Sequence, residues 1–268
     1  MVVVLVVGIS MGGYIMYKVV GERAGTALSG LLGGVISSTA TTVSFARRSA
    51  GVNGSVASSA TLAIMLASVV VYGRLFIELS AVAPRFMNVL APPLGAMGVV
   101  TLVLALTMYI AGRRNRGDIP PQENPTNLKG AFFFAGIYGA VVLASAVAHD
   151  KFGNSGLYVV AAISGLSDMD AITLSSGRAV TEGRLAAGEA WRVIVVALMS
   201  SMVMKVVICA MLGSWRLTVR LAALFAVNIA AGALIMVYWP TNLGVMGPEQ
   251  IEPAPIVAPA PPPLAPVE

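Results

Sequence analysis

Eight long apolar stretches, separated by short polar segments, make up most of the chain. They fall at about 2–19, 25–46, 56–79, 89–112, 128–149, 154–177, 190–211 and 217–239. A helix of about 20 apolar residues is long enough to cross the hydrocarbon core of a bilayer. The pattern therefore predicts an all-α protein, a polytopic transmembrane helical bundle of about eight spans.

The second and sixth stretches are less apolar than the other six. Polar side chains crowd both, among them Ser37, Ser38, Thr39, Thr41 and Thr42 in the second, and Ser164, Ser167, Asp168 and Asp170 in the sixth. On an α-helix, Asp168 and Asp170 point about 200° apart, so they converge on one ligand only if the helix breaks. Non-helical backbone at membrane depth is tolerated where it lines a cavity. We therefore expect helices 2 and 6 to be broken.

The chain also resembles itself at an offset of 131 residues, which places the first four stretches over the last four. Residues 34–47 (GVISSTATTVSFAR) then align with 165–178 (GLSDMDAITLSSGR) without a gap. Because four is an even number of spans, both halves should enter the membrane from the same face, and the repeat is predicted to be parallel. The expected domains are a four-helix repeat at 1–112, a basic connecting loop at 113–127, a second four-helix repeat at 128–240 and a proline-rich, disordered tail at 241–268.

Composition excludes several classes of protein. Hydrophobic residues make up 57% of the chain and charged residues 11%, far below the roughly 25% charge of soluble domains. A single cysteine and a single histidine exclude a disulfide scaffold, a zinc cluster and a haem site. We expect no enzyme activity and no cofactor. The net charge of +5 comes from scattered basic residues, which suit lipid headgroups better than nucleic acid.

Orientation in the membrane follows from the basic residues. Grouped by predicted face, they favour cytoplasmic termini, whereas the flanks of the first span, which is followed by Lys18 and Arg23, favour the reverse.

Candidate chemistry lies with five ionisable residues inside the predicted spans: Arg74, Glu78, Asp168, Asp170 and Lys205. Each costs about 2.5–3.5 kcal/mol at a helix centre. Three carboxylates against two cations leave one negative charge, which a metal ion or a proton would balance. We expect Asp168 and Asp170 to be metal ligands or proton acceptors. Hydroxyl oxygens would complete the ion-binding site, from Ser37, Ser38, Thr39, Thr42 and Thr173. Arg74, Glu78 and Lys205 would act as intramembrane counter-charges.

Structural explanations compete with this site. The small and hydroxyl residues are also typical of close helix packing. Asp168 and Asp170 could be used entirely in ion pairs with Arg74 and Lys205. Glu78 lies four residues after Arg74, the spacing of an intrahelical ion pair, and could simply neutralise it.

Two strings, GLLGGVISSTATTVSFARRS (30–49) and LYVVAAISGLSDMDAITLSSGRA (157–179), carry a family resemblance, together with Arg74, Glu78 and the Asn124–Pro125 turn. Over about residues 1–240 the chain resembles the membrane domain at the C-terminal end of many bacterial MgtC/SapB-type proteins, domain-of-unknown-function family 4010. The resemblance implies a bacterial inner-membrane protein without an established activity. The motif positions that it carries over are Ser37, Ser38, Thr39, Thr41, Thr42, Asp168, Asp170 and Thr173.

This chain departs from the resemblance in two ways. It begins at the first span, without the N-terminal MgtC-type region of longer relatives, and its seventh span reads SSMVMK where an asparagine is expected after the serine.

From these observations we expect a secondary transporter or channel-like carrier of a small ion. An oxygen-only site suits a hard cation such as Mg²⁺ as the substrate, with proton coupling through a desolvated aspartate. An anion held by half-helix N-termini and the two buried cations is a variation. The alternative is a non-transporting regulator or subunit, whose partners would be other membrane helices, an MgtC-type protein or a second copy of the chain.

Overall fold

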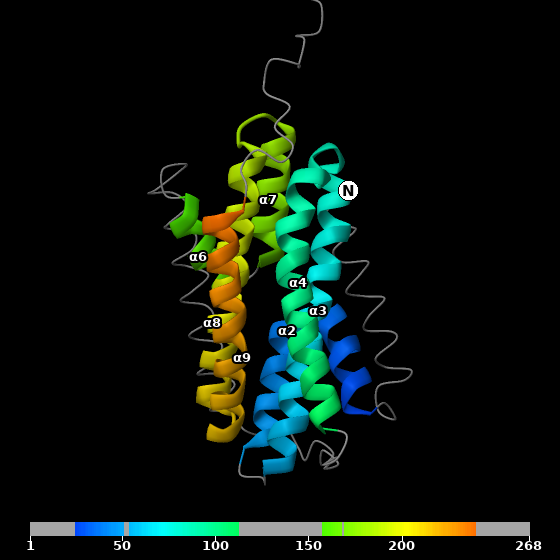
Figure 1. Cartoon of the computed structure of the whole chain (residues 1–268). Helices are drawn as coiled ribbons and strands as arrows, with labels where there is room; N and C mark the ends of the chain where they lie inside the picture. The colour runs from blue at the N-terminus through cyan, green and yellow to red at the C-terminus, as the bar shows by residue number, and fades with distance from the viewer. Residues whose placement is uncertain (1–24, 51–53, 113–156, 168, 240–268) are drawn as a thin grey trace, which may run out of the picture.

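The computed structural model describes residues 25–50, 54–112, 157–167 and 169–239. These residues form helices and turns and contain no strand: α2 (Thr26–Ser49), α3 (Gly54–Val82), the 3-10 turn η1 (Pro84–Phe86), α4 (Met87–Gly112), α6 (Leu157–Ser167), α7 (Met169–Thr181), α8 (Ala187–Leu212) and α9 (Trp215–Tyr238). The long helices pack side by side in one bundle (Figure 1). The all-α prediction is confirmed for this part of the chain. The first and fifth predicted spans, the 113–127 loop and the tail lie outside it.

By length and composition alone, five helices could cross a membrane. They are Thr26–Ser49, Val56–Val82, Pro84–Ile110, Ala187–Leu212 and Trp215–Tyr238, and a shorter apolar helix covers Leu157–Leu166. Large apolar side chains on α4 and α9 remain exposed, among them Val99, Leu102, Ile110, Leu234 and Val237. Exposed apolar surface of this extent suits lipid contact, so the described part of the chain has the character of a membrane protein.

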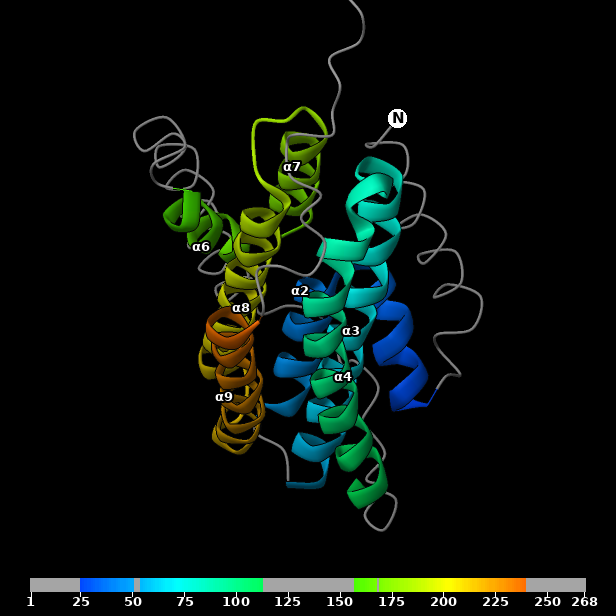
Figure 2. The same cartoon turned by 45° about the horizontal axis from the view of Figure 1, so that its top comes forward.

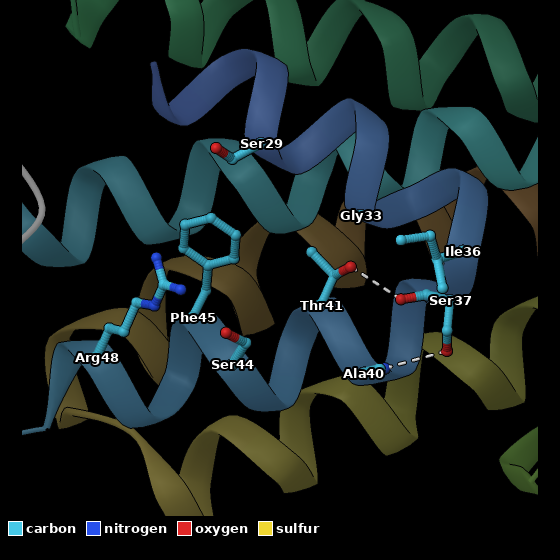
Figure 3. A pocket seen from close by; sticks show the side chains of 9 residues that line it. All are labelled: Ser29, Gly33, Ile36, Ser37, Ala40, Thr41, Ser44, Phe45 and Arg48. Carbon is cyan, nitrogen blue, oxygen red and sulfur yellow. Dashed lines mark hydrogen bonds between the residues drawn. The ribbon is translucent and has the colours of Figure 1, made fainter. Parts of the chain in front are cut away.

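Helix α2 folds back on itself at Ser37. The backbone there is extended, with φ −166° and ψ 115°. A β-carbon on Gly33 would lie 2.5 Å from Thr41 Oγ1, although eight residues of continuous helix would separate the two by about 12 Å. The two arms therefore lie against each other, as Figure 3 shows. The predicted break in helix 2 is confirmed, and its form is a reversal of the chain.

The predicted sixth span also consists of two helices, α6 and α7. Asp170, near the start of α7, pairs with Arg74 of α3. Thr181 Oγ1, at the end of α7, donates to the carbonyl of Val82, which lies later along α3. Helix α7 therefore runs in the same direction as α3.

Helix α6 instead follows α8. The Tyr158 hydroxyl bonds to Glu189, and the backbone at Gly165 closely approaches Ala197. The Tyr158–Glu189 contact lies earlier along both helices than the Gly165–Ala197 contact. Helices α6 and α8 therefore run in the same direction.

Helices α3 and α8 run in opposite directions. The Ser58 side chain near the start of α3 bonds to Arg220, just after α8 ends, and Ser49 Oγ accepts from the Ser214 backbone N–H at the same end of the bundle. At the other end, Val82 meets Thr181, shortly before α8 begins. Since α6 follows α8 and α7 follows α3, α6 and α7 also run in opposite directions.

The predicted parallel four-helix repeats are therefore wrong for the described helices. The prediction assumed that every apolar stretch crosses the membrane, which gives an even number of crossings in each half. In the structure, α2 and the α6–α7 pair reverse instead. The second arm of α2 and helix α7 extend toward opposite ends of the bundle (Figures 1 and 2). The prediction had placed Arg47 and Arg178 on the same face of the membrane. In the structure they lie at opposite ends of the bundle, so the predicted grouping of basic residues by face also changes.

Two glycines set how closely the reversing helices approach the long ones. A β-carbon on Gly34 would lie 2.6 Å from Ala67 Cα of α3, and one on Gly165 would clash with the Ala197 carbonyl oxygen of α8. Backbone atoms cannot give way as a flexible side chain can. Any larger residue at either position must therefore separate the two helices.

We predict that Gly34→Ala and Gly165→Ala each lower the thermal stability of the purified protein in detergent. Overpacking costs about 1–3 kcal/mol. Gly73→Ala in α3 is the control, because no described atom lies within 4 Å of its β-carbon position. Alanine is the better helix former by about 1 kcal/mol, so the control should keep or raise the melting temperature. Equal melting temperatures for all three variants would contradict the close approach.

Candidate functional site

A buried charge cluster joins α3 to α7. The Arg74 side chain of α3 is 8% exposed, and its guanidinium forms an ion pair with the Asp170 carboxylate of α7. Arg74 Nε also lies 3.9 Å from Glu78 Oε1, one turn along α3, and Glu78 is completely buried. One cation thus faces two carboxylates, from its own helix and from a reversing helix.

The fourth charge of the described core is Lys205 on α8. It is 3% exposed, and its Nζ donates to Ser68 Oγ of α3 over 3.4 Å. Its charge is close enough to interact with that of Arg74. Two cations and two carboxylates balance formally, and this balance offsets the cost of placing each charge inside a membrane bundle.

Of the two predicted acidic ligands, the structure describes only Asp170. Asp170 contacts Arg74, and Asp168 lies outside the described residues. Within the described ranges, no group of three or more His, Cys, Asp or Glu side chains could hold a metal ion. The competing prediction, that these acidic residues form ion pairs, is confirmed for Asp170 with Arg74 and for Glu78 with Arg74.

The predicted hydroxyl ligands serve several purposes. Ser37 Oγ accepts from the Ala40 backbone N–H at 3.2 Å, which caps the second arm of α2. Thr42, fully buried, donates to the Ser38 carbonyl at 2.8 Å. Thr39 is half-buried. The described contacts therefore tie Ser37 and Ser38 into α2 rather than to Asp170.

Thr173 on α7 differs from these hydroxyls. It is completely buried, and its hydroxyl has no hydrogen-bond partner among the residues that the structure describes.

A cleft of about 150 Å³ lies between the two arms of α2 (Figure 3). It is lined by Ser29, Gly33, Ile36, Ser37, Ala40, Thr41, Ser44, Phe45 and Arg48. Of these, the sequence analysis had placed only Ser37 in the site. The Arg48 guanidinium lies 5.3 Å from the centre of the Phe45 ring. The lining is mostly apolar, and its polar groups are the hydroxyls and the Arg48 guanidinium, which would suit a small polar or anionic guest.

Sequence reasoning also missed a buried polar network between α3, α4 and α9. Asn228 donates to Thr101 Oγ1, which lies 3.2 Å from the Tyr72 hydroxyl. The signal was available, because Asn228 is the one amide within an otherwise apolar stretch at 217–239. Ser68 gave no comparable signal, since its role depends on Lys205, 137 residues later.

We predict that Arg74→Gln destabilises the protein more than Asp170→Asn does. Removing Arg74 leaves the buried Glu78 and the partly buried Asp170 without their shared cation, whereas removing the Asp170 charge leaves Arg74 with Glu78. Breaking a buried ion pair from one side costs about 3–5 kcal/mol. Thermal unfolding in detergent measures the order. Arg184→Gln is the control, since its pair with Glu182 is exposed and contributes about 0–1 kcal/mol. The reverse order would show that Glu78 does not share Arg74.

Comparison with known proteins places the chain among uncharacterised relatives. It is 29% identical over 217 residues to an uncharacterized protein of Aquifex aeolicus (strain VF5), and the match covers 78% of this chain and 92% of that protein. No solved structure matches. The link to MgtC/SapB-type proteins stays a prediction. The family model described as "Domain of unknown function (DUF4010)" matches residues 4–213, and the chain therefore belongs to this family.

Proposed function

We propose that this protein is a membrane carrier of a small ion, whose path runs between its reversing helices. The observation that carries the proposal is that α2 and the α6–α7 pair reverse inside a bundle of membrane-length helices, next to the buried charges Arg74, Asp170 and Lys205. Interrupted helices near the bilayer midplane form the binding sites of many secondary transporters. Ionisable residues at that depth mark ion pathways by default.

An inverted repeat supports this proposal. At the offset of 131, Thr26–Ser49 corresponds to 157–180, Gly54–Val82 to 185–213 and Met87–Gly112 to 218–243, close to the bounds of α6 with α7, of α8 and of α9. Arg74 corresponds to Lys205. Because α3 and α8 run in opposite directions, we infer that the halves are related by an axis in the membrane plane. Such repeats underlie alternating access in several transporter folds.

The proposed cargo is a hard cation such as Mg²⁺, carried as substrate. Asp168 and Asp170 would supply carboxylate oxygens, which hard cations prefer, and Ser37, Ser38 and Thr39 would supply hydroxyls from the other half. In the described state Arg74 occupies Asp170. Loading would therefore require Arg74 to exchange Asp170 for Glu78, which already lies 3.9 Å from it. Ion binding is thereby linked to a change in how α7 is held against α3.

The setting of this activity is the bacterial inner membrane, with lipid as the main contact and no enzyme chemistry. An anion remains the competing cargo, because Arg74, Lys205 and the cleft beside Arg48 would favour negative charge. A screen of several ions distinguishes the two.

We predict that proteoliposomes containing the purified protein move at least one ion in a tracer or fluorescence screen of Mg²⁺, Ca²⁺, Na⁺, H⁺ and phosphate. Asp168→Asn and Asp170→Asn should each lower the flux at least about tenfold, since a lost charged ligand costs more than 1.4 kcal/mol. Glu182→Gln, which removes an exposed carboxylate, should leave the flux unchanged. Undiminished flux in both aspartate variants would overturn the proposed site, and no flux of any ion would favour the regulator alternative.

We predict that the turns after α2 and α7 lie on opposite sides of the membrane. Single cysteines at exposed Ala50 and Arg184 test this in a Cys209→Ala background, which removes the buried native thiol. A membrane-impermeant maleimide should label one position in right-side-out vesicles and the other in inverted vesicles. Labelling of both from the same side would restore the parallel arrangement and remove the inverted repeat.

A further inference from the structure

The interface between α3 and α7 contains polar side chains beyond the Arg74–Asp170 ion pair. Both helices run in the same direction, and they meet at Arg74 with Asp170 and, two turns later, at Val82 with Gly177. Glu78 lies one turn after Arg74 and one turn before Val82. Thr173 lies about one turn after Asp170 and one turn before Gly177. The register therefore places Glu78 and Thr173 at the same level of the interface, on facing sides.

The hydroxyls at this level are unusual for the protein. Four other buried hydroxyls, those of Thr42, Thr61, Ser68 and Thr101, each donate to a carbonyl four residues earlier in their own helix. Thr173 and Ser176 on α7 have no hydrogen-bond partner among the described residues, and they are 0% and 2% exposed. A buried polar group without a partner costs about 1–3 kcal/mol, so a ligand that bound these two oxygens would recover that cost. Ser176 follows Thr173 by three residues, which places it on the same side of α7, one turn further along.

The contrast is sharpest between equivalent positions of the two halves. Thr173 corresponds to Thr42 at the offset of 131 residues. Thr42 is equally buried but donates to the Ser38 carbonyl at 2.8 Å. Burial in a helix therefore does not by itself explain the free hydroxyl of Thr173.

The charges around this level leave room for a cation. Arg74 is the cation shared by Glu78 and Asp170, so this group of three is negative by one unit when all are ionised. Lys205 bonds to Ser68, about 15 Å before Glu78 along α3 at 1.5 Å per residue. Among the other described residues near α7, Arg178 is exposed and Arg192 of α8 pairs with Glu189. Helix α4 has no charged residue, and the arginines of α9 and α2 lie in the half of the bundle where α3 begins.

We propose that Glu78, Thr173 and Ser176 form a binding site for a coupling cation, a proton or a sodium ion, distinct from the site of the transported ion. The site rests on the proposed carrier function. A carboxylate and two hydroxyls supply the oxygen donors that a small hard cation takes, and a single positive charge neutralises the group around Arg74. Binding would free Arg74 from Glu78 and leave it with Asp170. Loss of the cation would draw Arg74 toward Glu78 and release Asp170.

Solid-supported membrane electrophysiology on proteoliposomes of the full chain tests the site without knowledge of the cargo. A Na⁺ jump at constant pH and a pH jump without Na⁺ are applied separately, with choline balancing ionic strength. We expect a charge-displacement transient from at least one jump in the wild type, which identifies the ion. Glu78→Gln should abolish it, and Glu78→Asp should retain it. Thr173→Val should raise a half-saturating Na⁺ concentration about tenfold, since one ligand is lost.

Two matched variants control for charge and for burial. Glu182→Gln removes an exposed carboxylate, and Thr61→Val removes a fully buried hydroxyl that already has a partner in α3. Both should respond as the wild type does. If Glu78→Gln does not yield monodisperse protein, Glu78→Asp and Thr173→Val carry the test for a Na⁺ response, and the pH dependence of Glu78→Asp carries it for a proton response.

The results separate this site from the carrier function. No transient in the wild type, or a wild-type transient in Glu78→Gln, overturns the coupling site even if the ion screen finds a transported cargo. A transient that depends on Glu78, in a protein that transports nothing in that screen, supports the site and overturns the carrier.

Discussion

The arrangement of this bundle depends on one guanidinium shared between the buried Glu78 carboxylate and the partly buried Asp170 carboxylate. Arg74 contacts Asp170 of α7 and lies within 3.9 Å of Glu78 on its own helix. Neither carboxylate could remain ionised at this depth without a cation nearby, because the bilayer supplies no water to solvate it. The ion pair therefore fixes the level at which the reversing helix α7 meets α3. The same contact also determines which acidic group remains available to a bound ion.

The reversing helices are stable only because their unpaired backbone groups are satisfied locally. Ser37 accepts from the Ala40 N–H where the second arm of α2 begins, and Thr41 donates to the Ser37 carbonyl at 2.8 Å. Gly34 and Gly165 let each first arm lie directly on the backbone of its neighbouring long helix. Hydroxyl capping and close glycine packing are thus used together. The polar composition that lowered the hydropathy of these two stretches is the composition that a reversal requires.

The sequence predicted the helices well and their directions poorly. Apolar length identified the long helices, and the clustering of small and hydroxyl residues identified the break at Ser37. The spacing of Arg74 and Glu78 also predicted their ion pair. The parallel repeat failed, because hydropathy measures length and polarity but not whether a broken helix continues or turns back. The contact of Lys205 with Ser68 was equally inaccessible, since it joins helices whose relative position depends on those turns.

The length of the α2 arms has an electrostatic consequence. The arm Thr26–Ile36 contains 11 residues, which extend about 16 Å at 1.5 Å per residue, roughly half of a 30 Å hydrocarbon core. Polar groups at the tip of such a hairpin can therefore reach the middle of the membrane from one side. If a second hairpin enters from the other side, as the proposed inverted repeat requires, the low-dielectric layer that opposes a dehydrated charge is divided into two thinner layers. The Born energy that the proposed carrier must overcome would then be set by the one layer that is closed.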